Sequence, residues 1–284
     1  DDLVLIDPEG YQISNLHSQD ISRPKRTVDW DIRAAEKQGY PHFMLKEIHE
    51  QPQAVRNAMR GRLLQPEGIS KLGGLRDVWK QIVGMERLFI VSCGTSYYAG
   101  LLGRYIIEES TDIAVEVDLA SEFRYRKLNF KEGTVVLAIS QSGETADTLV
   151  AIREARRKGA LVLGLVNVVG SSIARETDAG VYNHAGPEVG VASTKSFISQ
   201  LTILYLIALS LARHQALPLG EGQAFLNELI SIPKKIQQIL DGAAHIQAIA
   251  RRFSHYRNFL YLGRKFNYPI ALEGALKLKE ISYL

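Results

Sequence analysis

Three short segments of this chain place a glycine and several hydroxyl groups at the start of a predicted helix. They are residues 93–96 (CGTS), 140–145 (SQSGET) and 190–195 (GVASTK). The second segment follows an apolar run, residues 134–139, that is typical of a buried strand. Its helix is expected to begin near Glu144. A strand, a hydroxyl-rich turn and a helix therefore follow one another within a few residues.

The turn at residues 140–145 is suited to binding an anion. The first N–H groups of a helix have no partner within the helix, and the helix dipole is positive at that end. The turn contains no Lys and no Walker pattern, which favours a phosphate monoester of a small metabolite over a nucleoside triphosphate. The alternative is an ordinary Ser/Thr cap of a helix, with no ligand.

The three turns together indicate a ligand that is both phosphorylated and rich in hydroxyl groups. If the segments belong to one parallel sheet, the turns that follow the strands face one cleft at its carboxyl edge. Many short hydrogen-bonding groups are what a sugar ring requires. The sequence therefore predicts a sugar phosphate site.

A possible catalytic pair occurs near the C-terminal end of the chain. Lys277 and Glu280 are three residues apart on a predicted helix, so an ammonium group can orient a carboxylate on the same face. A carboxylate within reach of an acidic C–H group can act as a base. The alternative is an ordinary surface ion pair, which this spacing often produces.

Composition excludes several other classes of protein. The chain has 284 residues, a net charge of +3, 46% hydrophobic residues and one cysteine. This charge is too small to indicate nucleic acid binding, and the single Cys93 excludes an intrachain disulfide. Cys93 has apolar neighbours and is expected to be packed inside the protein. The apolar stretch at 201–211 is interrupted by Thr202 and Ser210, which favours a buried helix over a membrane span, and a cytoplasmic location is expected.

The order of elements predicts an α/β fold. Apolar runs at 88–92, 114–117, 135–139, 161–166 and 180–182 are expected to be strands, and helices are expected between them. A charged helix is expected before them at 43–64, and a long helix after them at 193–214. Such alternation predicts a mainly parallel sheet with helices on both faces.

Three regions are expected along the chain. Residues 1–25 are expected to be the end of another domain and a linker, with a strand at 3–6 and irregular structure from 11 to 31. Residues 26–218 form the main lobe with its preceding helix. Residues 219–284 contain connecting helices, a strand at 259–263 and a helix at 268–283, which repeat the pattern at 89–94 and suggest a second, incomplete lobe. An incomplete lobe suggests that the sequence is truncated.

These motifs resemble the sugar isomerase (SIS) half of the glutamine–fructose-6-phosphate aminotransferases, also called glucosamine-6-phosphate synthases. The resemblance extends from about Tyr40 to Leu284. It is carried by the segments 46–52 (KEIHEQP), 93–96, 120–126 (ASEFRYR), 140–145, 191–195 and 271–280 (ALEGALKLKE). Residues 1–25 are similar to the end of the family's glutaminase domain.

The resemblance implies a SIS-type three-layer sandwich, a homodimer, and neither a metal nor another cofactor. It implies that the chain binds fructose 6-phosphate and glucosamine 6-phosphate, with a glutaminase domain as partner in the full-length protein. The phosphate would be held by Ser140, Gln141, Ser142 and Thr145. The sugar would be held by Thr95, Ser96, Val191 and Ser193. Glu280 would be the base that moves a proton between C1 and C2, with Lys277 beside it.

The chain departs from the family pattern in its catalytic residues. No cysteine matches the N-terminal nucleophile of the glutaminase, and the family's ring-opening histidine and imine-forming lysine match segments beyond Leu284. We therefore expect this chain to bind the sugar phosphate without performing the complete reaction.

Two other functions fit a SIS lobe. One is a non-catalytic sugar-phosphate sensor, which usually carries a helix-turn-helix before the lobe, whereas this chain begins with a strand and a polar segment. The other is a simple aldose–ketose phosphate isomerase with one lobe, which the second partial lobe and the Lys277–Glu280 helix argue against.

Overall fold

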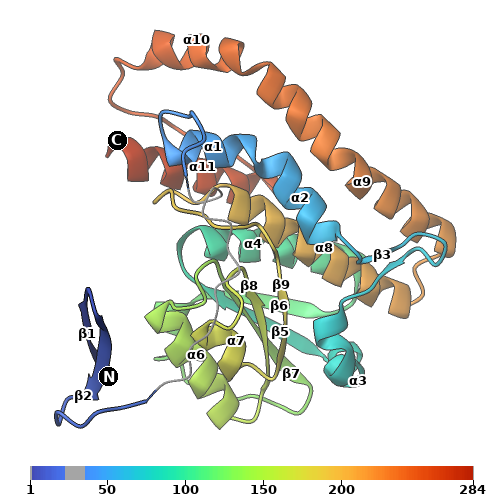
Figure 1. Cartoon of the computed structure of the whole chain (residues 1–284). Helices are drawn as coiled ribbons and strands as arrows, with labels where there is room; N and C mark the ends of the chain where they lie inside the picture. The colour runs from blue at the N-terminus through green and yellow to red at the C-terminus, as the bar shows by residue number, and fades with distance from the viewer. Residues whose placement is uncertain (1, 23–35, 284) are drawn as a thin grey trace. The chain divides into compact units, whose positions relative to one another are not determined.

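A computed structural model describes residues 2–22 and 36–283 of the chain (Figure 1). The chain divides into two compact units, residues 1–34 and 35–284. The boundary expected near residue 25 lies outside the described residues. Each unit is described by itself.

The N-terminal unit is a β-hairpin. Strand β1 (Asp2–Asp7) pairs antiparallel with β2 (Gly10–Asn15). The turn between them is held by Asp7, whose Oδ1 atom accepts hydrogen bonds from the backbone N–H groups of Glu9 and Gly10, both at 2.8 Å. The strand expected at 3–6 is confirmed, whereas the irregular structure expected from residue 11 is wrong up to Asn15, because this segment pairs with β1.

The main unit is built on five parallel strands in the spatial order β6-β5-β7-β8-β9. The strands are β5 (Arg87–Ser92), β6 (Ala114–Leu119), β7 (Thr134–Ser140), β8 (Leu161–Val166) and β9 (Ala179–Tyr182). The chain first runs from β5 to β6 on one side and then continues with β7 on the other side of β5. The sheet therefore has its topological switch point between β5 and β7.

Alternating residues of the central strands face opposite sides of the sheet. Leu88 and Ile90 of β5 and Leu137 of β7 belong to one buried cluster, whereas Phe89 of β5 and Val136 of β7 belong to the other. Both faces are apolar, as a parallel sheet between two helical layers requires. The α/β fold and the three-layer arrangement predicted from the sequence are confirmed.

Helices cover the two faces of the sheet (Figure 1). The first layer contains α2 (Gln51–Met59), α4 (Gly94–Ser110), α8 (Lys195–His214) and α9 (Leu219–Asp241). The second contains α5 (Ala120–Phe123), α6 (Ala146–Arg157) and α7 (Ser172–Glu176). Helix α8 is long and apolar enough to cross a membrane, but 83% of its apolar window is buried inside the protein, so it is a core helix.

The helix expected at 43–64 is wrong in its extent. It is divided at Glu50 into α1 (Phe43–His49) and α2, because Pro52 has no N–H group to continue the hydrogen bonds of α1 and is favoured in a first helical turn. Beyond α2 the chain forms a short hairpin of β3 (Leu63–Leu64) and β4 (Ile69–Ser70). The helical segments η2 (Gly73–Val78) and α3 (Trp79–Val83) follow and lead into β5.

The C-terminal part contains α10 (Ala243–Phe253) and α11 (Asn267–Ser282), but no strand between them. The strand expected at 259–263 is therefore wrong. Leu260 is 84% exposed and Leu262 is 83% exposed, so this apolar segment has no neighbouring strand with which to pair. Helix α11 packs against α4, and the rings of Phe266 and Tyr105 meet edge to face at 5.9 Å.

Candidate functional site

A cavity of about 220 Å³ lies at the carboxyl ends of β5 and β7. This position is the topological switch point of the sheet, where the helices that follow the two strands turn to opposite faces. In open α/β sheets, ligands bind in the crevice at this point.

The turn after β5 forms one wall of the cavity. Cys93 follows the last residue of β5 in an extended conformation, and Gly94 adopts a φ of 56°, which allows the chain to turn sharply into α4. Thr95 and Ser96 line the cavity. The hydroxyl of Ser96 accepts a hydrogen bond at 3.0 Å from the side-chain amide of Gln200 in α8, which fixes its position. Cys93 also lines the cavity. It packs against the apolar cluster on one face of the sheet, as expected, but it is only half-buried, so the expectation of a buried thiol is wrong.

The turn after β7 forms a second wall and is held by its own hydroxyl groups. Ser140 Oγ accepts the N–H of Gly143 at 3.0 Å and lies 3.2 Å from the hydroxyl of Thr145. Ser142 Oγ accepts the N–H of Glu144 at 3.2 Å. Helix α6 begins directly after Thr145. The turn therefore presents hydroxyl groups and a helix N-terminus to the cavity.

The loop between β9 and α8 supplies a third side. Val191 is 96% exposed and Ser193 is half-buried, and both line the cavity. The hydroxyl of Ser193 donates a hydrogen bond to Glu188 at 2.9 Å. The oxygen of Ser193 thus retains lone pairs that can accept a hydrogen bond from a ligand hydroxyl.

Helix α11 closes the cavity with two charged groups. Lys277 Nζ lies 2.7 Å from Glu280 Oε2 and donates a hydrogen bond to the hydroxyl of Thr95 at 2.8 Å. The ion pair that the spacing predicts is present, and both of its residues line the cavity.

All ten site residues predicted from the sequence line this one cavity. They are Thr95, Ser96, Ser140, Gln141, Ser142, Thr145, Val191, Ser193, Lys277 and Glu280. Lys277 is the one cation among the lining residues of the described structure, so an anionic ligand would rely on hydroxyl groups, backbone N–H groups and this single ammonium.

Comparisons with known proteins identify the family of the chain. A profile of the SIS domain family matches residues 81–210, which run from α3 into α8. The C-terminal domain of the glucosamine-fructose-6-phosphate aminotransferase from Francisella tularensis superimposes with a TM-score of 0.83 at 40% identity. The match covers 87% of this chain and 69% of that one. The chain belongs to the glutamine–fructose-6-phosphate aminotransferase family.

Curated relatives of the same name are similar over the whole chain. The glutamine–fructose-6-phosphate aminotransferase [isomerizing] of Chlorobaculum tepidum is 47% identical over 283 residues, and that of Thermotoga maritima is 44% identical over 283 residues. In both, the aligned part is 46% of the relative, so the chain spans a little under half the length of the aminotransferases it matches.

The fold extends beyond the aminotransferase family. The glucosamine-6-phosphate deaminase from Thermotoga maritima superimposes with a TM-score of 0.56 at 21% identity, over 85% of this chain and 68% of that one. This likeness shows a shared fold alone.

The structure adds Glu273, a residue that the sequence analysis of the aminotransferase motifs did not select. Its side chain is buried behind Thr95, which donates a hydrogen bond to Glu273 Oε1 at 3.1 Å. Its Oε2 atom is buried and has no hydrogen-bond partner among the described residues. Burial raises the pKa of Glu273 to about 7, although the nearby ammonium of Lys277 lowers it. The sequence contained one sign of this role: Glu273 is four residues before Lys277, so the two side chains share a helix face. The same spacing is common on surface helices and therefore does not distinguish a buried pair.

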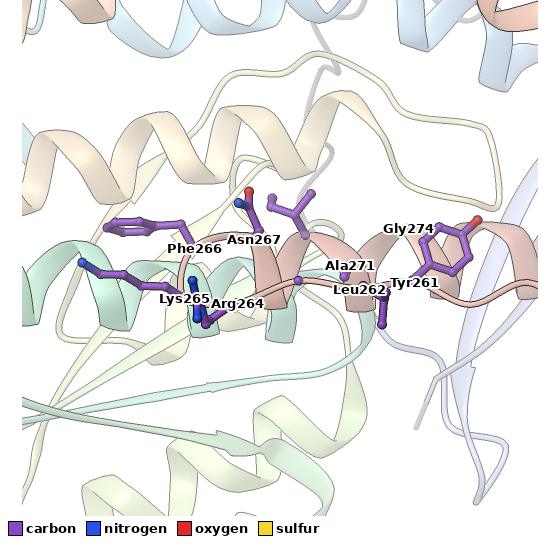
Figure 2. A pocket seen from close by; sticks show the side chains of 10 residues that line it. Tyr261, Leu262, Arg264, Lys265, Phe266, Asn267, Ala271 and Gly274 are labelled. Carbon is purple, nitrogen blue, oxygen red and sulfur yellow. The ribbon is translucent and has the colours of Figure 1, made fainter.

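A second hollow of about 790 Å³ lies between the segment 261–266 and the first turns of α11 (Figure 2). It is lined by this one continuous stretch of chain, residues 261–274, and contains no carboxylate. The smaller cavity is the better candidate site, because side chains from four separate parts of the chain converge there. Within residues 2–22 and 36–283, no group of three His, Cys, Asp or Glu side chains is arranged to hold a metal ion.

Proposed function

We propose that the chain is the isomerase part of a glucosamine-6-phosphate synthase. In this reaction fructose 6-phosphate and glutamine-derived ammonia give glucosamine 6-phosphate, a step in amino-sugar biosynthesis. The observation that supports the proposal is the convergence of three hydroxyl-bearing turns and the Lys277–Glu280 pair on one cavity at the switch point of the sheet. The identity of the sugar phosphate, fructose 6-phosphate, is inferred from the aminotransferase family to which the chain belongs.

The phosphate group is assigned to the turn after β7. Ser140, Gln141, Ser142 and Thr145 lie at the N-terminus of α6, where unpaired N–H groups and the helix dipole favour a negative charge. Hydroxyl groups that already accept backbone N–H groups are preorganised to donate their protons to phosphate oxygens.

The sugar is assigned to the other two turns. Thr95 and Ser96 come from the turn after β5, and Val191 and Ser193 come from the loop before α8. A chain of carbon atoms with a hydroxyl on each needs several short polar groups on opposite sides, and this pair of turns offers them.

Glu280 is assigned the proton transfer. Once ammonia has formed an imine at C2, the carboxylate removes a proton from C1 and returns a proton to C2, which converts the ketose skeleton into the aldose. The ion pair with Lys277 at 2.7 Å holds the carboxylate in one orientation. This is the role that a base needs, provided that it is within reach of the C–H group.

The proposal includes the rest of the enzyme. The resemblance to the family assigns ring opening to a histidine and imine formation to a lysine other than Lys277, so neither step is assigned to Lys277 or Glu280. We therefore assign the complete reaction to a longer, homodimeric, cytoplasmic protein that also carries a glutaminase domain. This chain supplies the sugar phosphate site and one catalytic carboxylate.

The assignment of Glu280 can be tested in the intact enzyme. E280Q should lower kcat for glucosamine 6-phosphate formation by about 100- to 10,000-fold, the usual contribution of a general base. The dissociation constant for fructose 6-phosphate should change little, since Gln keeps the size and one oxygen of the side chain. Neighbouring Lys279 is exposed, and K279Q is a matched surface control. A kcat for E280Q equal to that of the wild type would exclude Glu280 as the base.

A further inference from the structure

The loop between β9 and α8 is held in place by side chains and not by its own backbone. It carries Val191 and Ser193, which line the cavity. The backbone N–H groups of Val189 and Gly190 donate their hydrogen bonds to a carboxylate from a distant part of the sequence, Glu47. The position of the loop therefore depends on that side chain.

Glu47 lies on α1 and is almost completely buried, with 1% of its surface exposed. Its Oε1 atom accepts the N–H of Val189 at 2.6 Å and that of Gly190 at 3.1 Å, and its Oε2 atom lies 3.2 Å from the same Gly190 nitrogen. Burying a carboxylate is unfavourable unless it is hydrogen-bonded, and these N–H groups provide the compensation. Accordingly, burial raises the pKa of Glu47, while its hydrogen bonds to the loop oppose the change.

The absence of a side chain at Gly190 is part of this contact. A Cβ atom at that position would lie 2.5 Å from Glu47 Oε2 and 3.4 Å from the backbone of Met44. Only glycine therefore lets the loop backbone approach the carboxylate so closely. Gly190, which was expected only to allow a turn, also leaves the space that the carboxylate of Glu47 occupies.

A second carboxylate holds the other side of Val191. Glu188 Oε1 accepts the N–H groups of Thr194 at 2.8 Å and Ser196 at 3.2 Å, which caps the start of α8. Its Oε2 atom accepts the hydroxyl of Ser193. Val191 thus projects from a short segment that is fixed at both ends.

Glu50 is another carboxylate near Glu47, and its ion pairs do not include the backbone of residues 189–190. Glu50 lies one turn away and pairs with Lys195 at 2.5 Å and with Lys46 at 3.4 Å. Glu50 can therefore be changed to test the effect of charge separately from the effect of the hydrogen bonds to the loop.

We propose that Glu47 is a positioning residue that clamps residues 189–190 and so fixes Val191 and Ser193 at the sugar end of the cavity. It determines the affinity for the sugar part of the ligand and leaves the phosphate turn unaffected. This inference rests on the proposed function for the assignment of sugar and phosphate to the two ends.

The experiment compares E47L, E47Q and E50Q with the wild-type chain by calorimetric titration with fructose 6-phosphate and with inorganic phosphate. E47L should weaken fructose 6-phosphate binding about tenfold or more, through the contacts of the displaced loop, and change phosphate binding by less than about twofold. E47Q keeps one oxygen acceptor and should lie between E47L and the wild type. E50Q removes a negative charge and leaves the hydrogen bonds to residues 189–190 in place, so it should bind both ligands as the wild type does.

Amide hydrogen exchange of the same samples supplies a second readout. The amides of Val189 and Gly190 should lose protection in E47L, whereas those of β7 stay protected and show that the sheet is intact. If E47L does not fold, E47Q carries the test with the same two readouts.

Each outcome is decisive. Equal fructose 6-phosphate affinity in E47L, E47Q and the wild type, or a parallel loss of phosphate affinity, would overturn the role of Glu47. If the wild-type chain binds phosphate but not fructose 6-phosphate, the proposed function fails and the role in sugar affinity fails with it. In that case, amide hydrogen exchange at Val189 and Gly190 still shows whether Glu47 holds the loop in place.

Discussion

The buried carboxylate of Glu273 accepts a hydrogen bond from the hydroxyl of Thr95 at 3.1 Å, although 178 positions separate them in the sequence. The same hydroxyl accepts a hydrogen bond from Lys277 at 2.8 Å. Helix α11 is thereby joined to the turn after β5 through Thr95. These three side chains link helix α11 to one wall of the cavity, which Thr95 and Lys277 line.

The first prediction concerns the pH dependence of stability. Glu273 has a pKa of about 7 in the folded protein against 4.5 when unperturbed, so the folded state holds one more proton between these values. The free energy of unfolding should therefore decrease as pH rises from 4.5 to 7, by roughly 3 kcal/mol at most. Glu47, whose pKa is also raised by burial, contributes in the same direction.

E273Q removes the contribution of Glu273 and should flatten the profile, whereas the exposed Glu132 offers a matched control in E132Q. The measurement is urea unfolding at several pH values from 4.5 to 8. Parallel profiles for E273Q and the wild type would show that Glu273 does not titrate in this range.

The second prediction concerns the phosphate turn. S142A and T145A should each weaken binding of fructose 6-phosphate by about 1–3 kcal/mol, because a charged acceptor loses a donor. Calorimetric titration measures the change, and S231A in α9, whose serine does not line the cavity, is the control. Unchanged binding in both cavity variants would exclude this turn as the phosphate site.

The third prediction concerns Gly143, which has a φ of 68°. An added Cβ atom would lie 2.0 Å from Ser171 Oγ, so G143A should destabilise the protein by about 2–5 kcal/mol through overpacking and backbone strain. Adding S171G removes the close contact but not the unfavourable φ, and should restore part of the loss. Urea unfolding checks both variants. Wild-type stability of G143A, or no recovery in the double variant, would contradict this account of the turn.

The sheet and most of the site could be predicted because their signals are local. Apolar runs mark the strands, and the hydroxyl-rich turns at 93–96 and 140–145 follow them directly. The order of the strands brings these turns together, and a parallel sheet with a switch point leaves one crevice for them. The resemblance to the aminotransferases then supplied the roles of individual residues, which remain predictions.

The remaining features depend on contacts between distant segments. Glu273 becomes a site residue only because α11 packs against α4 and buries it behind Thr95. The segment 259–263 has the composition of a strand, but strand formation requires a neighbour to accept its backbone hydrogen bonds. The break after α1 had a visible signal, Pro52, which the expected helix at 43–64 overlooked.

The central claim is that the cavity at the ends of β5 and β7 binds fructose 6-phosphate. The most direct test is calorimetric titration of the wild-type chain with fructose 6-phosphate, with unphosphorylated fructose as the control. We predict saturable binding of the phosphate ester and no measurable binding of fructose, since the phosphate turn anchors the ligand. Absence of binding by a folded sample, or equal binding of both sugars, would contradict the assignment of this cavity.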